Sequence, residues 1–423
     1  MPGALLLAHV DEGGDIAPGM PGALTGRQEV SSRGFVMLLA CAAVFLDSAT
    51  YGVVVPLIPV YAREMGIGEF RLGMLFTGYA GVLLVAAIPM GMLSDRYSRR
   101  PLIVFGMVGT AASCVLYAIS SSFNGLMLAR MLDGLTAAAS WSAGLAIVGD
   151  RFEKTEMGTK MGYVIGAAAV GGIAGPVLGG GLSDAIGFSA PFYTMAVVCA
   201  LSGISALFLR EKRCRKKGTA FGVHRMLLPV LKNRNLLLAC MITMTVTVGL
   251  GLIEPTLPVF FTREFGMSQF EIGILFGLTT GAYALVCPFA GRLSDRIGRK
   301  PPIIAGIAST AIIAPFLGLP GSRLILYLAM TLIGATLALL ETPSIPLITD
   351  SLASGEGEEP GNHGTAFGIL NLFWSAGYAL GPLMGGALMG WLGLGFALGA
   401  YSVLLLILLV PVALLLKNPS RAA

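Results

Sequence analysis

The chain has 423 residues, of which 55% are hydrophobic and only 12% are charged. Soluble globular proteins carry about 25% charged residues, so this composition excludes a water-exposed surface over most of the chain. The 58 glycines are about twice the ordinary usage, which suits helices that pack closely in lipid. The net charge of +5 does not indicate a nucleic-acid partner, because the basic residues are sorted between loops. The composition therefore predicts an all-α membrane protein with many spans.

Apolar stretches of about 20 residues, the length at which a helix crosses a bilayer, alternate with short polar connections from residue 34 to residue 416. They predict twelve transmembrane helices, at 34–62, 71–93, 101–120, 125–149, 161–182, 190–209, 235–261, 271–291, 302–319, 323–349, 364–388 and 394–416.

Lysine and arginine are unevenly distributed over the connections, and this predicts the topology. Even-numbered connections carry 19 of the 28 basic residues, whereas odd-numbered connections carry four. Since cytoplasmic loops hold the excess, we expect both termini in the cytoplasm. The longest connection is a basic linker that divides the chain. The predicted domains are a cytoplasmic tail (1–33), a six-helix half (34–209), the linker (210–234), a second six-helix half (235–416) and a short cytoplasmic tail (417–423).

The two halves repeat one another in sequence. Three segments recur at a shift of 199 or 200 residues: PLIP (56–59) and PTLP (255–258), REMG (63–66) and REFG (263–266), GMLSDRYSRRP (91–101) and GRLSDRIGRKP (291–301). This identity on both sides of the basic linker indicates duplication. Two pseudo-symmetric six-helix halves with a site at their interface are the plan of a transporter.

The third repeated segment follows spans 2 and 8 at the predicted cytoplasmic edge. It resembles the signature loop of the major facilitator superfamily, and the resemblance covers essentially the whole chain. The resemblance implies the major facilitator fold and a gating role for this loop. Its aspartates can accept hydrogen bonds from helix N-termini while its arginines pair with acidic groups. The candidate gating residues are Gly91, Asp95, Arg96, Arg99, Gly291, Asp295, Arg296 and Arg299.

Span 5 carries a glycine pattern that recurs in span 11 at the same spacing. The span-5 copy consists of Gly162, Gly171, Gly175, Pro176, Gly179 and Gly180. Glycine removes side-chain bulk and proline removes a backbone donor, so helix packing alone accounts for the pattern equally well. The pattern also resembles the span-5 motif that marks drug:proton antiporters within the superfamily, and this resemblance favours export.

Ionisable residues inside spans are costly, so each is a candidate functional residue. Asp47 lies near the middle of span 1, with Tyr51 one turn further along the same helical face. Glu254 lies in span 7 and Glu341 in span 10. A carboxyl group in apolar surroundings holds a proton more readily, and a cationic ligand displaces that proton, which is the simplest antiport mechanism. A structural hydrogen bond or a buried ion pair is the alternative for each residue.

Arg130, in span 4, is the only basic residue well inside a predicted span. With its surroundings it resembles the RxxQG-type motif that is associated with proton coupling in the superfamily, although Asp133 stands where that motif has glutamine. The two side chains are also spaced to pair with one another, which is the simpler interpretation.

The placement of the carboxylates resembles that of vesicular amine transporters. Two positions depart from that pattern: Asn371 stands where those transporters have a span-11 aspartate, and Tyr79 where they have a span-2 lysine. Trp374 and Tyr378 follow Asn371 on one face of span 11, and Trp141 lies in span 4. Such aromatic faces hold an organic cation in some proteins and serve only packing in others.

Motifs of enzymes and metal sites are missing from the sequence: there is no HExxH, no Walker loop and no CxxC. The sequence therefore predicts a proton-coupled antiporter that exports cationic or amphipathic small molecules, such as amines and drugs. Its energy source is the proton gradient, and no cofactor or metal is expected. An uptake transporter or facilitator of a metabolite is the first alternative, and a non-transporting sensor or scaffold is the second. We expect a monomer in a bacterial plasma (inner) membrane.

Overall fold

The computed structural model describes residues 25–96, 98–153, 155–210, 230, 233–319, 321–353 and 363–416. Within these ranges the chain is helical and contains no strand. In a bilayer every backbone polar group must be satisfied inside its own segment, which helices achieve. Ten helical segments of the described chain are long and apolar enough to span a membrane, and a shorter apolar helix covers Ala190–Ala206.

The elements fall into two groups in chain order. The first half contains α1 (Thr25–Val54), η1 (Val55–Leu57), α2 (Ile58–Met65), α3 (Glu69–Arg96), α4 (Arg99–Ile119), α5 (Phe123–Arg151), α6 (Met157–Ala185) and α7 (Ala190–Ala206). The second half contains α9 (Arg234–Phe265), α10 (Gln269–Ile297), α11 (Lys300–Ile313), η2 (Ala314–Gly318), α12 (Arg323–Glu341), α13 (Ser344–Ala353), α14 (His363–Leu392) and α15 (Leu394–Leu415).

Two predicted spans differ from continuous helices. Span 1 is interrupted by the short 3-10 segment η1, where Pro56 lacks the backbone donor that a continuous helix needs. Span 10 is divided between α12 and α13 around Thr342 and Pro343. At its start, α1 extends into the predicted tail, whose residues 1–24 lie outside the described chain, as do most residues of the basic linker.

The duplicated segments REMG and REFG adopt the same turn. Gly66 ends α2 with φ of 61°, and Gly266 ends α9 with φ of 60°. A left-handed residue after the last helical turn closes the helix C-terminus, and glycine adopts that conformation without steric cost. The duplication read from sequence therefore persists in the backbone.

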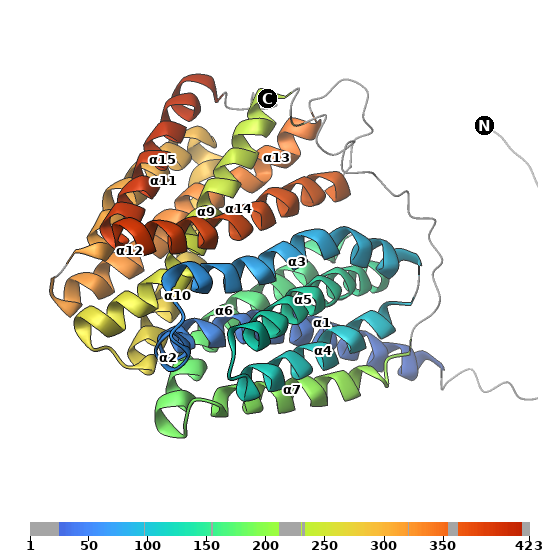
Figure 1. The fold of residues 1–423 in the computed structure, drawn as a ribbon. Helices are drawn as coiled ribbons and strands as arrows, with labels where there is room; N and C mark the ends of the chain where they lie inside the picture. The colour runs from blue at the N-terminus through green and yellow to red at the C-terminus, as the bar shows by residue number, and fades with distance from the viewer. Residues whose placement is uncertain are drawn as a thin grey trace, which may run out of the picture.

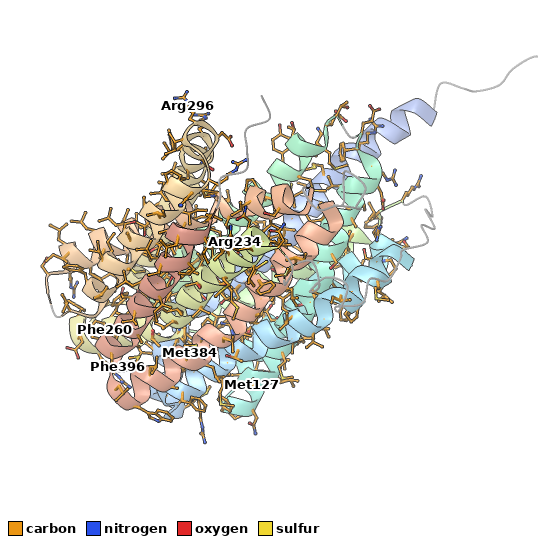
Figure 2. The ribbon with its side chains drawn as sticks, turned by 90° about the horizontal axis from the view of Figure 1, so that it is seen from above. Met127, Arg234, Phe260, Arg296, Met384 and Phe396 are labelled. Carbon is orange, nitrogen blue, oxygen red and sulfur yellow. The ribbon has the colours of Figure 1, made fainter. Side chains whose placement is uncertain are left out.

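The halves pack against each other through two helix pairs, α3 with α14 and α6 with α10 (Figure 1). We call the end of the bundle at which α7 runs toward residues 210–234 the linker end, and the opposite end the far end. Figure 2 shows Arg296 at the end opposite to Met127, Met384 and Phe396. Arg296, near the C-terminus of α10, thus lies at the other end of the molecule from Met127, near the start of α5.

Glycines show where the two halves touch. At the far end, a Cβ added to Gly180 would clash with the backbone of Gln269 in α10. The pseudo-symmetric Gly386 has the same relation to Glu69 in α3. Toward the linker end, an added Cβ would meet nothing within 4 Å at any of four glycines on these faces: Gly81, Gly162, Gly166 and Gly281. The halves are therefore closed at the far end and separated toward the linker end.

Candidate functional site

A buried arginine forms the centre of the site in the first half. Arg130 on α5 is 1% exposed, and none of its guanidinium nitrogens has a hydrogen-bond partner among the described residues. Four rings surround it, with centres 4.2 to 5.9 Å from the guanidinium carbon: Phe76, Tyr51, Tyr79 and Tyr117. We call these four rings the aromatic cage. Since arginine keeps its charge inside proteins, the negative ring faces are the main groups that stabilise it here.

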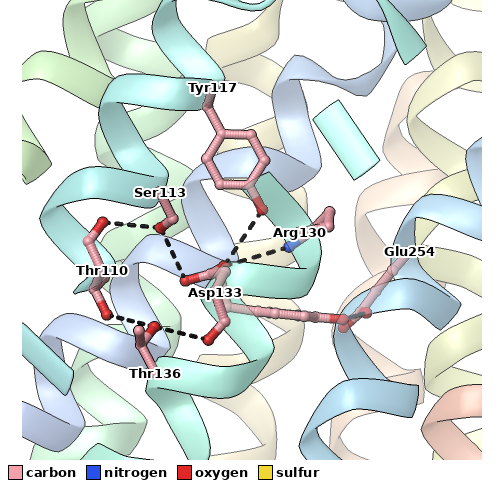
Figure 3. Close-up of polar contacts among 8 residues, drawn as sticks. Thr110, Ser113, Tyr117, Arg130, Asp133, Thr136 and Glu254 are labelled. Carbon is pink, nitrogen blue, oxygen red and sulfur yellow. Dashed lines mark hydrogen bonds and ion pairs between the residues drawn. The ribbon is translucent and has the colours of Figure 1, made fainter. Parts of the chain in front are cut away.

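Asp133 is the acidic partner of this arginine. Its carboxylate lies 3.9 Å from Arg130 Nη1, and both side chains are 1% exposed. Tyr117 and Ser113 of α4 donate to the same carboxylate, at 3.4 and 3.5 Å (Figure 3). The pairing of Arg130 with Asp133 that the i, i+3 spacing predicts is present. Tyr117 and Ser113, which the sequence did not single out, add hydrogen bonds to it.

Glu254 on α9 joins the two halves at mid-membrane. One carboxylate oxygen accepts a hydrogen bond from Tyr51 of α1, which belongs to the other half and also to the aromatic cage. The second oxygen accepts from Tyr378 of α14, within its own half, at 3.3 Å. A further inter-half bond runs from Thr77 of α3 to the carbonyl of Ala379, at 2.8 Å. Glu254 is thus the candidate carboxylate that contacts both halves.

Asp47 contacts a different set of groups from Tyr51, although the two share a helical face. The indole N–H of Trp141 donates to Asp47 Oδ2 at 2.7 Å. Asp47 is 4% exposed, and its other oxygen, Oδ1, has no partner among the described residues. The structure places no hydrogen bond or ion pair between Asp47 and Arg130. Trp141 is therefore a direct hydrogen-bond donor to this carboxyl group.

Glu341 has its own neighbours at the break between α12 and α13. Tyr283 of α10 donates to Glu341 Oε2 at 3.0 Å. Next to it, Thr342 donates to the sulfur of Cys287 at 3.3 Å. These contacts all lie within the second half, so Glu341 makes no link between the halves comparable to that of Glu254.

The three carboxyl groups share one property. Within the described chain, no lysine, arginine or histidine forms an ion pair with Asp47, Glu254 or Glu341, and the side chains that donate to them are neutral indole and phenol groups. Buried charges without a counter-ion are strongly unfavourable. Each group is therefore protonated or balanced by a cation, and for Glu254 the Coulombic attraction of Arg130 contributes to that balance.

An aromatic face on α14 lies next to Glu254. The rings of Trp374 and Tyr378 are 4.4 Å apart, and Tyr378 contacts Tyr51 across the interface at 6.2 Å. Asn371, one turn earlier on this helix, is exposed. The residue that stands where a lysine was expected from the resemblance, Tyr79, belongs to the aromatic cage. The face predicted from sequence thus borders the inter-half carboxylate.

The span-5 glycine pattern packs on two sides. Gly171, Gly175 and Gly179 pack against the α1 backbone, where a Cβ on Gly175 would lie 2.9 Å from Ala49 Cα. The ring of Pro176 also packs against α1, at Gly52, whereas its carbonyl and Gly180 face α10 of the other half. A Cβ added to Gly162 would meet no other atom within 4 Å. The pattern therefore contributes to the closed far end, and its role in export stays a prediction.

The signature loops bind within their own halves. Arg99 donates to Ser94 at 2.6 Å and to Asp150 of α5 at 3.1 Å. Arg299 repeats the first contact, to Ser294 at 3.2 Å, and pairs with Asp295 at 2.6 Å. The side chains predicted at Asp95 and Arg96 lie outside the described residues. A gating role for these loops stays a prediction.

Comparison with known proteins identifies the family. The model of the Major Facilitator Superfamily matches residues 40–351 and 239–423. The MFS-type transporter ppzB of Metarhizium majus is 25% identical, over 81% of this chain and 91% of that protein. The synaptic vesicular amine transporter of Homo sapiens is 25% identical, over 82% of this chain and 67% of that protein.

Solved structures share the fold. A bacterial homolog of the human lysosomal transporter Spinster, in an inward-facing and unoccupied conformation, superposes with a TM-score of 0.77 at 18% identity. The superposition covers 92% of this chain and 99% of that one. The nucleoside transporter NupG reaches 0.74 at 14% identity, covering 90% and 100%. The predicted fold is confirmed, and the chain belongs to the major facilitator superfamily as a multi-pass membrane transporter, not an enzyme.

Proposed function

We propose that this transporter is a proton-coupled antiporter that exports cationic or amphipathic small molecules, amines in the first place, by alternating access. The proton gradient is its energy source. The observation that carries the proposal is the presence of three buried carboxyl groups, Asp47, Glu254 and Glu341, which accept hydrogen bonds from neutral indole and phenol groups of the described chain.

Competition between a proton and a cation follows from that arrangement. A carboxyl group that lacks a counter-ion in the protein binds either a proton or a cationic substrate, and binding of one displaces the other. Three such groups set an upper limit of three exchanged charges for each cycle. The aromatic cage is already occupied by Arg130, so the rings that remain for a ligand are those of Trp374, Tyr378 and Trp141.

Glu254 is the carboxyl group that we assign to coupling. While ionised, it accepts from Tyr51 in the other half and so favours the far-end-closed conformation. A proton on the carboxyl converts one acceptor oxygen into a donor, and a bound cation draws charge away from the phenol. Both events weaken the link between the halves, which connects occupancy of the site to the conformational change.

Similar proteins support an amine substrate without fixing it. One similar protein is a synaptic vesicular amine transporter, whereas the superposed NupG is a nucleoside transporter. Since one fold hosts different substrates, the substrate class must come from the site. An excess of carboxyl groups over cations at that site favours a positively charged substrate.

The topology belongs to the same proposal. We infer that the linker end faces the cytoplasm, because 19 of the 28 basic residues lie in connections on that side. The far-end-closed conformation is then open toward the cytoplasm, ready to accept substrate for export. We assign the protein to a bacterial inner membrane as a monomer, on the strength of its short predicted external loops.

The test uses inverted membrane vesicles in which a pH gradient has been established. Adding a substrate of an antiporter lets protons leave, so the gradient should collapse for a subset of cationic amines and drugs and not for neutral sugars or acids. Collapse with metabolites only would support the uptake alternative. Activity that disappears on reconstitution of the pure protein into liposomes would support the sensor or scaffold alternative.

A further inference from the structure

In the first half, α4 lies on the side away from α9–α15 (Figure 1). A groove lined mostly by residues of α4 runs along this helix. Its volume is about 650 Å³, and its lining is almost wholly apolar. Seven of the residues that line it belong to α4, from Arg100 to Ala112, and Leu207 after α7 closes one side. The groove is separate from the carboxylate site between the halves.

The spacing of the lining residues makes the groove parallel to the helix. Val104, Phe105, Val108, Gly109 and Ala112 follow one face of α4 over about two turns. The twelve helical steps from Arg100 to Ala112 rise about 18 Å. One leaflet of a bilayer has a hydrocarbon depth of about 15 Å, half of the full core. The groove therefore matches the length of an acyl chain in a single leaflet.

Small residues form the floor and bulky ones the walls. A Cβ added to Gly109 would meet Thr136 of α5, so only glycine allows α4 this close to α5. Phe105 and Val108 are 42% and 46% exposed, and Ala112 is exposed as well. In a membrane protein such a surface contacts lipid, and a depression on it binds a chain more tightly than a flat face does.

Arginines gather where the groove reaches the linker end. Arg100 lines the mouth itself. Its neighbour Arg99 is bonded to Asp150, and the next residue, Arg151, donates to the carbonyl of Arg210, at 2.6 Å. Arg151 ends α5 and Arg210 follows α7, so both lie at the same end of the first half as Arg100, the arginine that lines the groove. Arginine forms bidentate contacts with phosphate.

We propose that this groove is a binding site for a phospholipid with a net negative headgroup, whose acyl chain lies along α4 and whose phosphate contacts Arg100. The lipid ties α4 to the ends of α5 and α7 at the linker end. Arg99, the residue next to Arg100, connects the signature loop to Ser94 and Asp150. A lipid bound at Arg100 therefore stabilises this loop and the helix ends beside it. This site is independent of the proposed antiport.

The experiment compares lipid binding by native mass spectrometry on the full chain in mild detergent. The probes are phosphatidylglycerol and phosphatidylcholine with identical acyl chains. The wild type should retain phosphatidylglycerol preferentially. Arg100→Gln should lower this preference about fivefold, the effect of one basic residue at a membrane surface. Ala112→Leu, which fills the groove, should lower retention of both lipids.

Matched controls separate a site from general charge or hydrophobicity. Arg33→Gln removes an exposed arginine from the same end of the half, and Val115→Leu enlarges an exposed residue just beyond the groove. Both should behave like wild type. The proposal is overturned if wild type shows no preference, if the control variants match the groove variants, or if soluble glycerol phosphate competes as well as the lipid. If Arg100→Gln fails to fold, Ala112→Leu, on the lipid-facing surface, decides the question.

Discussion

The hydrogen bond from Tyr51 to Glu254 predicts how a single hydroxyl sets the conformational equilibrium. Tyr51→Phe keeps the ring in the aromatic cage and removes only the donor that crosses between the halves. A hydrogen bond to an ionised group is worth about 1.5 to 3 kcal/mol. Since this bond exists only while the far end is closed, its loss should shift the equilibrium toward the opposite conformation by about 10- to 100-fold.

Tyr378→Phe is the matched control, because it removes the other phenol from the same carboxylate but within one half. Spin labels at Leu93 and Leu293, exposed and related by the duplication, report the separation of the linker ends in a background without native cysteines. Tyr51→Phe should increase the short-distance population, and Tyr378→Phe should not. An unchanged distribution in Tyr51→Phe, or an equal shift in both variants, would refute the assignment of this bond as the inter-half link.

Three further changes test other parts of the site. Asp47→Asn should abolish proton-coupled export and flatten the pH dependence of substrate binding, because an amide stays neutral and can neither release a proton nor pair with a cation as an anion; undiminished substrate-induced proton release would contradict this. Gly175→Ala should destabilise the protein by about 1 to 3 kcal/mol, because the new Cβ would lie 2.9 Å from Ala49 Cα. Gly166→Ala is the matched control: its Cβ would meet nothing within 4 Å, so the melting temperature should stay the same or rise. Asp295→Asn should slow the transport cycle with little change in substrate affinity; a large affinity loss at a normal exchange rate would place that residue elsewhere.

Contacts within a helical hairpin follow from the sequence once the turn is known. Tyr117 contacts Arg130, and Ser113, one turn earlier on α4, contacts Asp133, about one turn later on α5, as an antiparallel pair of helices requires. The same register pairs Thr110 with Thr136 at 3.0 Å, and the duplication repeats it as Thr310 with Thr336 at 2.9 Å. An antiparallel alignment of the predicted spans 3 and 4 would have placed Tyr117 beside the buried arginine.

Contacts between the halves could not be obtained in this way. Tyr51 and Glu254 are separated by 203 positions, and no repeat relates them. Their bond depends on how the two halves are tilted, which is a property of one conformation and not of the local pattern. The carboxylates could be predicted as functional because ionisable residues in a bilayer are costly, but their partners depend on tertiary packing. The role of Glu254 in linking the halves therefore emerged only from the structure.

The central claim is that Glu254 exchanges a proton for a cationic substrate, and substrate-induced proton release tests it most directly. Purified wild-type protein in weakly buffered solution should release protons when a transported amine is added, whereas Glu254→Gln should release fewer, by up to one for each bound substrate. In the wild type, the separation of the halves should depend on pH, because Tyr51 donates to Glu254 while that carboxyl group is ionised. Glu254→Gln should abolish this pH dependence. Proton release from Glu254→Gln equal to that of wild type, with substrate binding retained, would contradict the account and move the coupling to Asp47 or Glu341.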